Sequence, residues 1–288
     1  MAEKVHIVLI ADARYRPGLE ATRRSMIECC PTPERLVFHV LDEQSAAPMA
    51  DEIRTSFGTF RQSVMSVVRL FCAELFPDVD WVIFSDVDTL WFRDPCELWD
   101  LRNEDVSVQW VKDIPSTRRE TASWQRAWNP AFDPDRYGCA GVMLMNLRRM
   151  RQTSFIARCR AFVQQHGKPP YADQDILNSV LVGDTALLPA EWDVIRDYPL
   201  SQISWRAGRP QLVLHIIGIG KYFNTSPGGR LPQFDIWYRF VYGRFCLPWP
   251  RRVLFNILAV FYPLLRFLPV PDQIRRAFFF AWLRTRMF

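Results

Sequence analysis

The sequence predicts an α/β domain with a mostly parallel central sheet, followed by a shorter C-terminal segment. Short apolar runs rich in Val, Ile and Phe alternate with helical stretches along the first 217 residues. This alternation is typical of strands joined by crossover helices. The chain has 288 residues and is 49% hydrophobic, which is enough apolar material for one large core. We expect a domain over residues 1–235 and a separate segment over 236–288.

The N-terminal part predicts a β-α-β unit. Val5–Ile10 and Leu36–Leu41 are short apolar runs, and Pro17–Cys30 between them has the pattern of a helix. Pro31 and Pro33 would end this helix, because proline cannot continue it. The two runs are expected to form neighbouring parallel strands.

A second helix and strand lead into an acidic motif. From Phe60 to Phe76, apolar residues recur at the spacing of one helix face, at Val64, Val67, Val68, Phe71 and Leu75. Pro77 would close this helix. The continuous apolar run Trp81–Phe84 then predicts a buried strand that runs directly into Asp86.

The remaining elements complete the predicted domain. Gly141–Leu147 and Leu212–Ile217 have the pattern of strands, and the arginine-rich stretch Met150–Gln165 that of a helix. Asp173 is expected to be the N-cap of a further helix. The sequence contains neither a GxGxxG motif nor a Walker A motif, which argues against a dinucleotide enzyme and a P-loop NTPase.

The cysteines and the N-terminus bear on the cellular compartment. Seven cysteines form an odd number without a CxxC pair, which favours free thiols in a reducing cytosol, and the adjacent Cys29 and Cys30 do not suggest a metal site. The short apolar run after the N-terminus indicates a strand, not a signal peptide. Asn256, Pro263 and Arg266 interrupt the longest apolar window, so no membrane-spanning helix is expected.

The C-terminal 50 residues are basic and aromatic. Residues 239–288 contain nine arginines, one acid and 13 of the 40 aromatic residues. Because the whole chain carries a formal charge of +5, the first 238 residues carry −3. Basic charge mixed with aromatics favours an anionic membrane surface over nucleic acid, although single strands also bind arginine and aromatics. The alternative is that these aromatics pack on the domain as a C-terminal layer.

The acidic motif Ser85-Asp86-Val87-Asp88 is the first candidate for chemistry. Its two carboxylates stand at i and i+2 after a buried strand and would point the same way. Two such oxygen donors can hold a divalent cation that neutralises a diphosphate. A solvated turn is the plain alternative. A haloacid-dehalogenase phosphatase motif fits less well, because it requires Thr or Val at the position of Leu90.

Other blocks accompany this motif along the chain. They are Ala11-Asp12-Ala13-Arg14-Tyr15, Arg69-Leu70, Ala140-Gly141-Val142 with Asn146, Asp173-Gln174-Asp175-Ile176-Leu177-Asn178, and His215 with Gly218 and Lys221. Together, and in this order, they closely resemble glycosyltransferase family 8, the retaining group that includes bacterial lipo-oligosaccharide galactosyltransferases and glycogenin. The resemblance spans residues 5–223 and implies a GT-A fold.

The resemblance implies a role for each block. Asp86, Asp88 and His215 would hold the metal, and oxygen ligands with one imidazole suit Mn²⁺, with Mg²⁺ as the alternative. Asp173 and Gln174 would contact the donor sugar, with Gln174 beside the anomeric carbon, and Arg69 would lie near the sugar and diphosphate. The other implied donor contacts are Asp12 and Tyr15 at the uracil, Cys139 near the sugar, and Gly218 and Lys221 at the pyrophosphate. Ala11, Val87, Ala140 and Gly141 are also expected to bind the donor.

The chain departs from the family pattern at three places. Ala13 replaces the usual second acid of the first block, Cys139 replaces an Asn before Ala-Gly, and Tyr222-Phe223 replaces Pro-Trp after Lys221. The diphosphate chemistry should survive these changes. Cys139 leaves the donor sugar open, between galactose and glucose.

These observations lead to one main hypothesis. The chain is expected to transfer a hexose from a UDP-sugar, with retention, to a saccharide or lipid-linked glycan such as lipopolysaccharide. It is expected to work from the cytoplasmic face of a bacterial inner membrane, held at that surface by its tail. The rival hypotheses are a non-catalytic nucleotide-sugar binder and a membrane-surface scaffold on the same fold.

Overall fold

The computed structural model describes residues 2–57, 64–130, 132–195, 204–206 and 209–216. A six-stranded sheet with the order β2-β1-β3-β6-β5-β7 forms the centre. Its strands are β1 (Val5–Ile10), β2 (Leu36–Leu41), β3 (Trp81–Ser85), β5 (Val108–Lys112), β6 (Gly138–Asn146) and β7 (Thr185–Leu187). Three of the five strand pairs are parallel, so the predicted α/β class with a mostly parallel sheet is confirmed.

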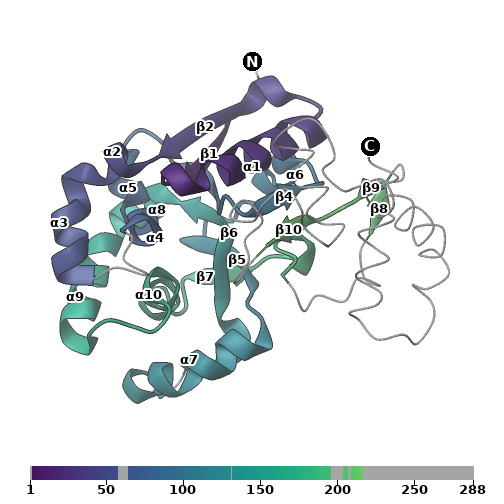
Figure 1. Ribbon diagram of the computed structural model, residues 1–288. Helices are drawn as coiled ribbons and strands as arrows, with labels where there is room; N and C mark the ends of the chain where they lie inside the picture. Colours follow the sequence, from purple (N-terminus) through teal and green to yellow (C-terminus); the bar gives the residue numbers. More distant parts are fainter. Residues whose placement is uncertain (1, 58–63, 131, 196–203, 207–208, 217–288) are drawn as a thin grey trace, which may run out of the picture.

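Helices cover both faces of this sheet (Figure 1). One face carries α1 (Arg16–Cys29) and α6 (Pro95–Trp99). The other carries α4 (Met65–Val68), α5 (Cys72–Leu75), α8 (Leu147–Gln152), α9 (Phe155–His166) and α10 (Ala172–Val180). The remaining helices are α2 (Glu43–Ala46), α3 (Ala50–Glu52) and α7 (Pro115–Trp128).

The alternation of side chains along the strands divides the core into two clusters. In β1, Ile7 and Leu9 pack toward α1, whereas Val8 packs toward the helices on the opposite face. The same alternation places Val82 and Ile83 of β3 in different clusters. Because both faces are covered, these strands are apolar along their whole length, which is the pattern from which they were predicted.

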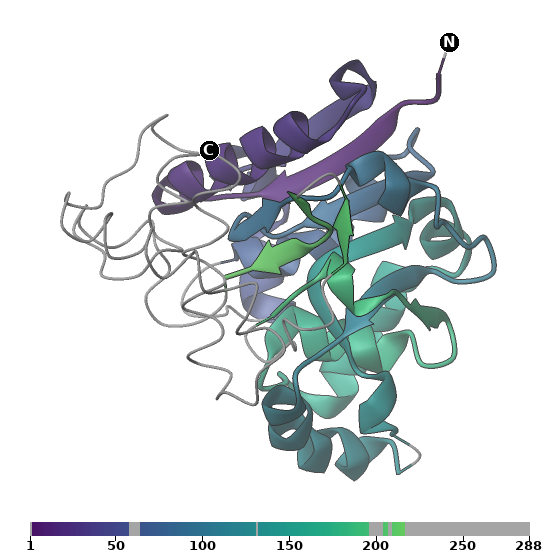
Figure 2. The same cartoon turned by 90° about the vertical axis from the view of Figure 1, so that its right-hand side faces the viewer.

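Two small sheets extend the fold beside the central one. β4 (Thr89–Trp91) pairs antiparallel with β10 (Val213–His215), and β8 (Trp205–Arg206) pairs with β9 (Arg209–Pro210). The turned view in Figure 2 shows β10 in front of the central sheet. This pairing brings the last described strand, more than 120 residues away in sequence, next to the segment that follows β3.

Two predicted helices are interrupted in the structure. In the described part of the Phe60–Phe76 stretch, a 3-10 turn at Arg69–Phe71 separates α4 from α5. The Met150–Gln165 stretch is divided at Ser154, whose φ of 49° lies in the left-handed region, between α8 and α9. The periodicity of apolar residues was correct in both cases, but it does not reveal a local change of backbone geometry.

Several predictions fall outside the described residues. These are the boundary at residue 235, the C-terminal segment 236–288 with its membrane contact, and the positions Gly218 and Lys221. Within the described ranges, no helix has the length and apolar character needed to cross a membrane.

Gly138 at the start of β6 provides a test of the packing. A Cβ atom there would lie 2.2 Å from three atoms of the buried Trp110 ring. We expect Gly138→Ala to lower the free energy of unfolding by about 1–3 kcal/mol, as overpacking does, measured by urea denaturation. In the Trp110→Leu background the same substitution should cost much less, and equal costs in both backgrounds would contradict this account.

Candidate active site

The acidic motif lies at the carboxyl end of β3, the edge at which α/β sheets commonly bind ligands. The backbone N–H of Asp86 donates to the carbonyl of Gly141 on β6 at 2.7 Å, and the Thr89 hydroxyl donates to the carbonyl of Asp86 at 2.9 Å. These bonds hold the turn between β3 and β4. The side chain of Asp86 is partly exposed, whereas Val87 and Asp88 are buried.

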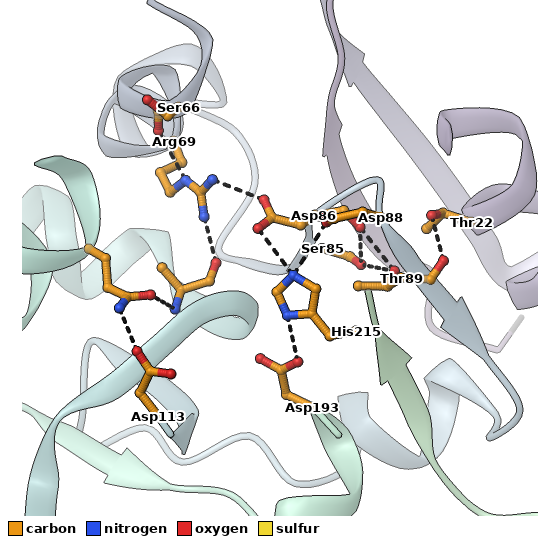
Figure 3. Close-up of polar contacts among 12 residues, drawn as sticks. Thr22, Ser66, Arg69, Ser85, Asp86, Asp88, Thr89, Asp113, Asp193 and His215 are labelled. Carbon is orange, nitrogen blue, oxygen red and sulfur yellow. Dashed lines mark hydrogen bonds and ion pairs between the residues drawn. The ribbon is translucent and has the colours of Figure 1, made fainter. Parts of the chain in front are cut away.

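His215 completes a three-residue group with these carboxylates (Figure 3). The pairing of β10 with β4 places His215 opposite Thr89. Its Nε2 lies 3.3 Å from Asp88 Oδ1 and 3.8 Å from Asp86 Oδ2. The three ligand atoms lie within 4.8 Å of one another, so two carboxylate oxygens and one imidazole nitrogen can meet at one ion. This donor set fits Mn²⁺ or Mg²⁺.

A residue that the sequence analysis missed fixes the orientation of the imidazole. Asp193 is buried and its Oδ1 lies 2.9 Å from His215 Nδ1, so the other ring nitrogen faces the acidic motif. Burial alone would lower the pKa of His215, but the carboxylates of Asp193 and Asp88 raise it well above its usual value. A carboxylate behind a histidine is the usual support for a metal-binding imidazole. A single acid between Trp192 and Val194 was the only sequence signal for this role.

Gly141 leaves room for the His215 ring. A Cβ atom at this position would lie 2.2 Å from His215 Cε1 and 2.5 Å from Nδ1. A larger residue would therefore push the imidazole away from the acidic motif. Cys139, two residues earlier on β6, is buried beside His215 and Asp193. Burial raises the pKa of its thiol, and the charges of Asp193 and Asp113 add to the rise.

The buried guanidinium of Arg69 connects the acidic motif with the neighbouring elements. Its Nη2 donates to Asp86 Oδ1 at 2.9 Å, and its Nη1 donates to the carbonyl of Ala140 at 2.6 Å. Its Nε lies 2.9 Å from Asp173 Oδ2 and also donates to the carbonyl of Ser66. Arg69 therefore joins the turn after β3, β6 and α10 at one point. The resemblance implied a place for it near the donor sugar and diphosphate, but these three partners were not predicted.

Asp173 and Gln174 project from the first turn of α10 toward this group. Asp173 is not the N-cap that the sequence predicted, because its carboxylate is taken by Arg69. Burial raises the pKa of Asp173 to about 6 even though Arg69 opposes this shift. Gln174 is held at both ends: its Oε1 accepts from the N–H of Ala140 at 3.0 Å, and its Nε2 donates to Asp113 Oδ2 at 2.7 Å.

Asp175 holds the start of α10 in place. Its buried carboxylate accepts from the backbone N–H of Tyr171, the residue that precedes α10. It also accepts hydrogen bonds from three side chains on α7 and beside β6, those of Thr121, Gln125 and Tyr137. With these donors in place, the first turn of α10 presents Asp173 and Gln174 in a fixed direction.

Asp113 is a second acid that the sequence analysis missed. It follows β5 directly, as Asp86 follows β3, and that position was the available signal. Burial raises its pKa to about 6, and the charge of Asp193 adds to the rise, while hydrogen bonds from the N–H of Ile114 and from Gln174 oppose it. Because Gln174 donates a hydrogen bond to Asp113, the charge state of Asp113 directly affects the strength of that bond.

The predicted nucleotide-base residues lie at the carboxyl end of β1. Ala11 is buried, and Asp12 caps the 3-10 turn Ala13–Tyr15 by accepting from the N–H groups of Arg14 and Tyr15. A cavity of about 300 Å³ lies there, lined by Asp12, Ala13, Arg14, Glu43, Arg54, Val64 and Met65. Tyr15 does not line it and packs partly against the core beside α1.

Comparisons with known proteins agree with this architecture. The sequence model of Glycosyl transferase family 8 matches residues 34–222, more than half of the chain, and starts after Asp12 and Tyr15. Among solved structures, the galactosyltransferase LgtC in complex with donor and acceptor sugar analogs superposes with a TM-score of 0.64 at 22% identity, over 86% of this chain and 99% of that one. The WbbM bifunctional glycosyltransferase gives 0.66 at 20% identity, over 88% of this chain and 52% of that one.

A mammalian relative matches over a shorter stretch. Glucoside xylosyltransferase 2 of Mus musculus is 30% identical over 149 residues, which are 45% of this chain and 33% of the mouse protein. The present chain therefore spans about a third of that relative and about half of WbbM. The structural matches establish that the fold is of the GT-A type, as the sequence resemblance implied.

Asp193→Asn tests the support of His215. An amide can donate to Nδ1 and leave the proton on Nε2, so we expect Mn²⁺ affinity to fall about 10- to 100-fold, the usual cost of losing such a partner, with the fold retained. Mn²⁺ titration followed by electron paramagnetic resonance would measure it. Asp184→Asn, which removes a structural carboxylate bonded to Ser107 and Arg149, should leave the affinity unchanged. Equal effects of the two substitutions would contradict the assignment.

The pKa of Asp113 predicts a pH dependence. Because its pKa in the folded state lies above the unfolded value, the protonated form stabilises the fold, and this contribution is lost as pH rises through about 6. We therefore expect the free energy of unfolding of metal-free Asp113→Asn, relative to that of wild type, to rise by on the order of 2–3 kcal/mol between pH 4 and pH 7.5. Urea denaturation would measure it. For Asp135→Asn, the free energy of unfolding relative to wild type should instead fall as pH rises, because Lys112 and Arg118 lower the pKa of Asp135. A pH-independent difference for Asp113→Asn would refute the prediction.

Proposed function

The chain belongs to glycosyltransferase family 8, and from this premise we propose that it transfers a hexose from a UDP-sugar to a glycan acceptor with retention of the anomeric configuration. The proposed donor sugar is galactose or glucose. The proposed acceptor is lipopolysaccharide or another lipid-linked saccharide. Family membership carries the general activity, a glycosyl transfer; the donor, the acceptor and the metal are the parts that we propose.

The grouping of Asp86, Asp88 and His215 at the carboxyl end of β3 is the observation that carries this proposal. A divalent cation held by these side chains would supply positive charge to the diphosphate of the donor. Asp193 orients the imidazole for this purpose, and Gly141 gives it room. If these residues served only to pack a core, the acids around His215 would destabilise the fold, because buried like charges repel.

Other side chains would position the donor sugar. Arg69 and Asp173 form a buried ion pair beside Asp86, so a guanidinium and a carboxylate lie next to the diphosphate side of the site. Carboxylates accept hydrogen bonds from sugar hydroxyls, and we assign this task to Asp173. The cavity beside Asp12 would receive the nucleotide base.

Gln174 bears on the choice between mechanisms of retention. An amide is neutral and weakly basic, which makes it a poor nucleophile for a covalent intermediate. We therefore propose attack on the face from which the diphosphate departs. The bond between the anomeric carbon and the diphosphate oxygen breaks, the bond to the acceptor oxygen forms, and the acceptor proton passes to the departing phosphate oxygen. Gln174, held by Ala140 and Asp113, would place its carbonyl dipole beside the cationic centre.

The rival hypotheses differ in what they require. A non-catalytic binder would bind UDP-sugar with metal and release no UDP, and a membrane-surface scaffold would bind neither. The peripheral association with a bacterial inner membrane remains a proposal that rests on the composition of residues 239–288.

A donor screen tests the proposed function. The full-length protein would be incubated with UDP-galactose, UDP-glucose or UDP-xylose, with Mn²⁺ or with chelator, and UDP release measured with and without a saccharide acceptor. We expect Mn²⁺-dependent release from a hexose donor, and a loss of about 100-fold or more in Asp88→Asn, since several kcal/mol of charge stabilisation disappear. Asp100→Asn, at an exposed acid after α6, is the control.

The possible results separate the hypotheses. UDP binding by calorimetry without turnover would favour the non-catalytic binder, and absence of binding would favour the scaffold. Turnover of UDP-xylose alone would reject the hexose assignment, an outcome that the mouse relative makes worth testing. Full activity in chelator would reject the metal.

A further inference from the structure

A second cluster of metal-binding side chains lies where the end of α1 meets the start of α6. It consists of Cys30, Asp94 and Cys96, with Thr32 beside them. Cys30 follows α1, Cys96 lies in the first turn of α6, and 66 positions separate the two in sequence. Only the folded chain brings them together, so neither cysteine spacing nor the adjacent pair Cys29-Cys30 could reveal the cluster.

The geometry of the cluster suits a tetrahedral ion. The sulfur atoms of Cys30 and Cys96 lie 3.7 Å apart. With a zinc–sulfur bond of about 2.3 Å, two thiolates on a tetrahedral ion stand about 3.8 Å apart. A carboxylate oxygen of Asp94 lies within 4.8 Å of both sulfurs, which supplies a third ligand.

The carboxylate and a nearby hydroxyl are fixed independently of any ion. Asp94 is the N-cap of α6, and its Oδ1 accepts from the N–H of Cys96 at 2.9 Å. The hydroxyl oxygen of Thr32 lies 3.9 Å from each sulfur. The ligands are therefore held by the helix start and the loop after α1, so little rearrangement would be needed to bind an ion.

The thiols are protonated at neutral pH without a cation. Burial raises the pKa of Cys30 to about 12 and also raises that of Cys96, and the charge of Asp94 adds to both shifts. A bound dication would replace both thiol protons and offset the carboxylate.

We propose that Cys30, Cys96 and Asp94 form a second metal site, which takes a thiophilic divalent cation of the zinc class. The chemistry of its ligands separates it from the acidic motif: two thiolates select softer ions, whereas the two carboxylates and the imidazole near Arg69 suit harder ones. One chain would thus hold two divalent cations, each in a site whose ligands match its hardness.

The position of the site gives the ion a structural task. Thr22 and Ser25 of α1 bond to the backbone of Thr89 and Trp91 in β4, and the Cys29 thiol donates to the carbonyl of Arg93. These contacts form the seam between α1 and the segment that follows the acidic motif. An ion bound by Cys30 and Cys96 closes the end of this seam and stabilises the fold.

Cobalt titration of the reduced, full-length, metal-free protein tests the proposal. We expect a near-ultraviolet thiolate-to-cobalt charge-transfer band, which added Zn²⁺ abolishes. Cobalt held by Asp86, Asp88 and His215 gives no such band, and Cys139→Ser, which removes the thiol beside His215, should retain the band. Zn²⁺ should also raise the melting temperature of the wild type, in a reductant that does not bind metals.

Substitutions provide the controls. Cys30→Ser and Cys96→Ser should lose the band and show a smaller thermal shift, whereas Cys29→Ser, which keeps a donor to Arg93 next to the cluster, should retain both in full. Asp94→Asn keeps an N-cap acceptor and should weaken cobalt binding at least about 10-fold, which decides the matter if a cysteine variant unfolds. A missing band in wild type, a band that survives in Cys96→Ser, or a Cys30–Cys96 disulfide in air-purified protein that shows no band after reduction would overturn the proposal.

Discussion

The buried charge of Arg69 is the interaction on which the candidate active site depends. A guanidinium can stay buried only when carboxylates and carbonyls surround it, and here they come from Asp86, Asp173 and Ala140. Its plane also lies over the Phe84 ring, 4.5 Å from the centroid. Because these partners belong to the turn after β3, to β6 and to α10, the need to satisfy one arginine sets the mutual positions of the acidic motif and the first turn of α10.

The same centre carries more negative than positive charge. Asp88, Asp173 and Asp193 are buried and Asp86 is partly so, against the charges of Arg69 and a protonated His215. Such an excess is unfavourable in a poorly solvated region. A divalent cation bound by these carboxylates would offset the excess of negative charge.

The sequence predicted which residues come together at the acidic motif better than it predicted the residues that support them. The strand ending at Asp86, the i and i+2 carboxylates and the α/β class follow from local patterns, and the structure brings His215 to them. Asp193 and Asp113 were missed because each is a single acid beside apolar residues, and nothing local indicates which buried partner it meets. The cap of α10 was assigned to Asp173 because of its place in sequence, whereas Arg69, about 100 positions away, takes that carboxylate, and no side chain in the described part of the chain caps the start of α10.

The direction of β6 explains why one end of the sheet can hold the whole site. In a fully parallel sheet, the start of β6 would lie at the edge opposite to Asp86. β6 instead runs antiparallel to β3, with Val142 opposite Ser85, so Cys139, Ala140 and Gly141 lie beside the acidic motif. Ala140 can then bond both Arg69 and Gln174 through its backbone. Because these are backbone contacts of Ala140, they do not depend on the identity of its side chain.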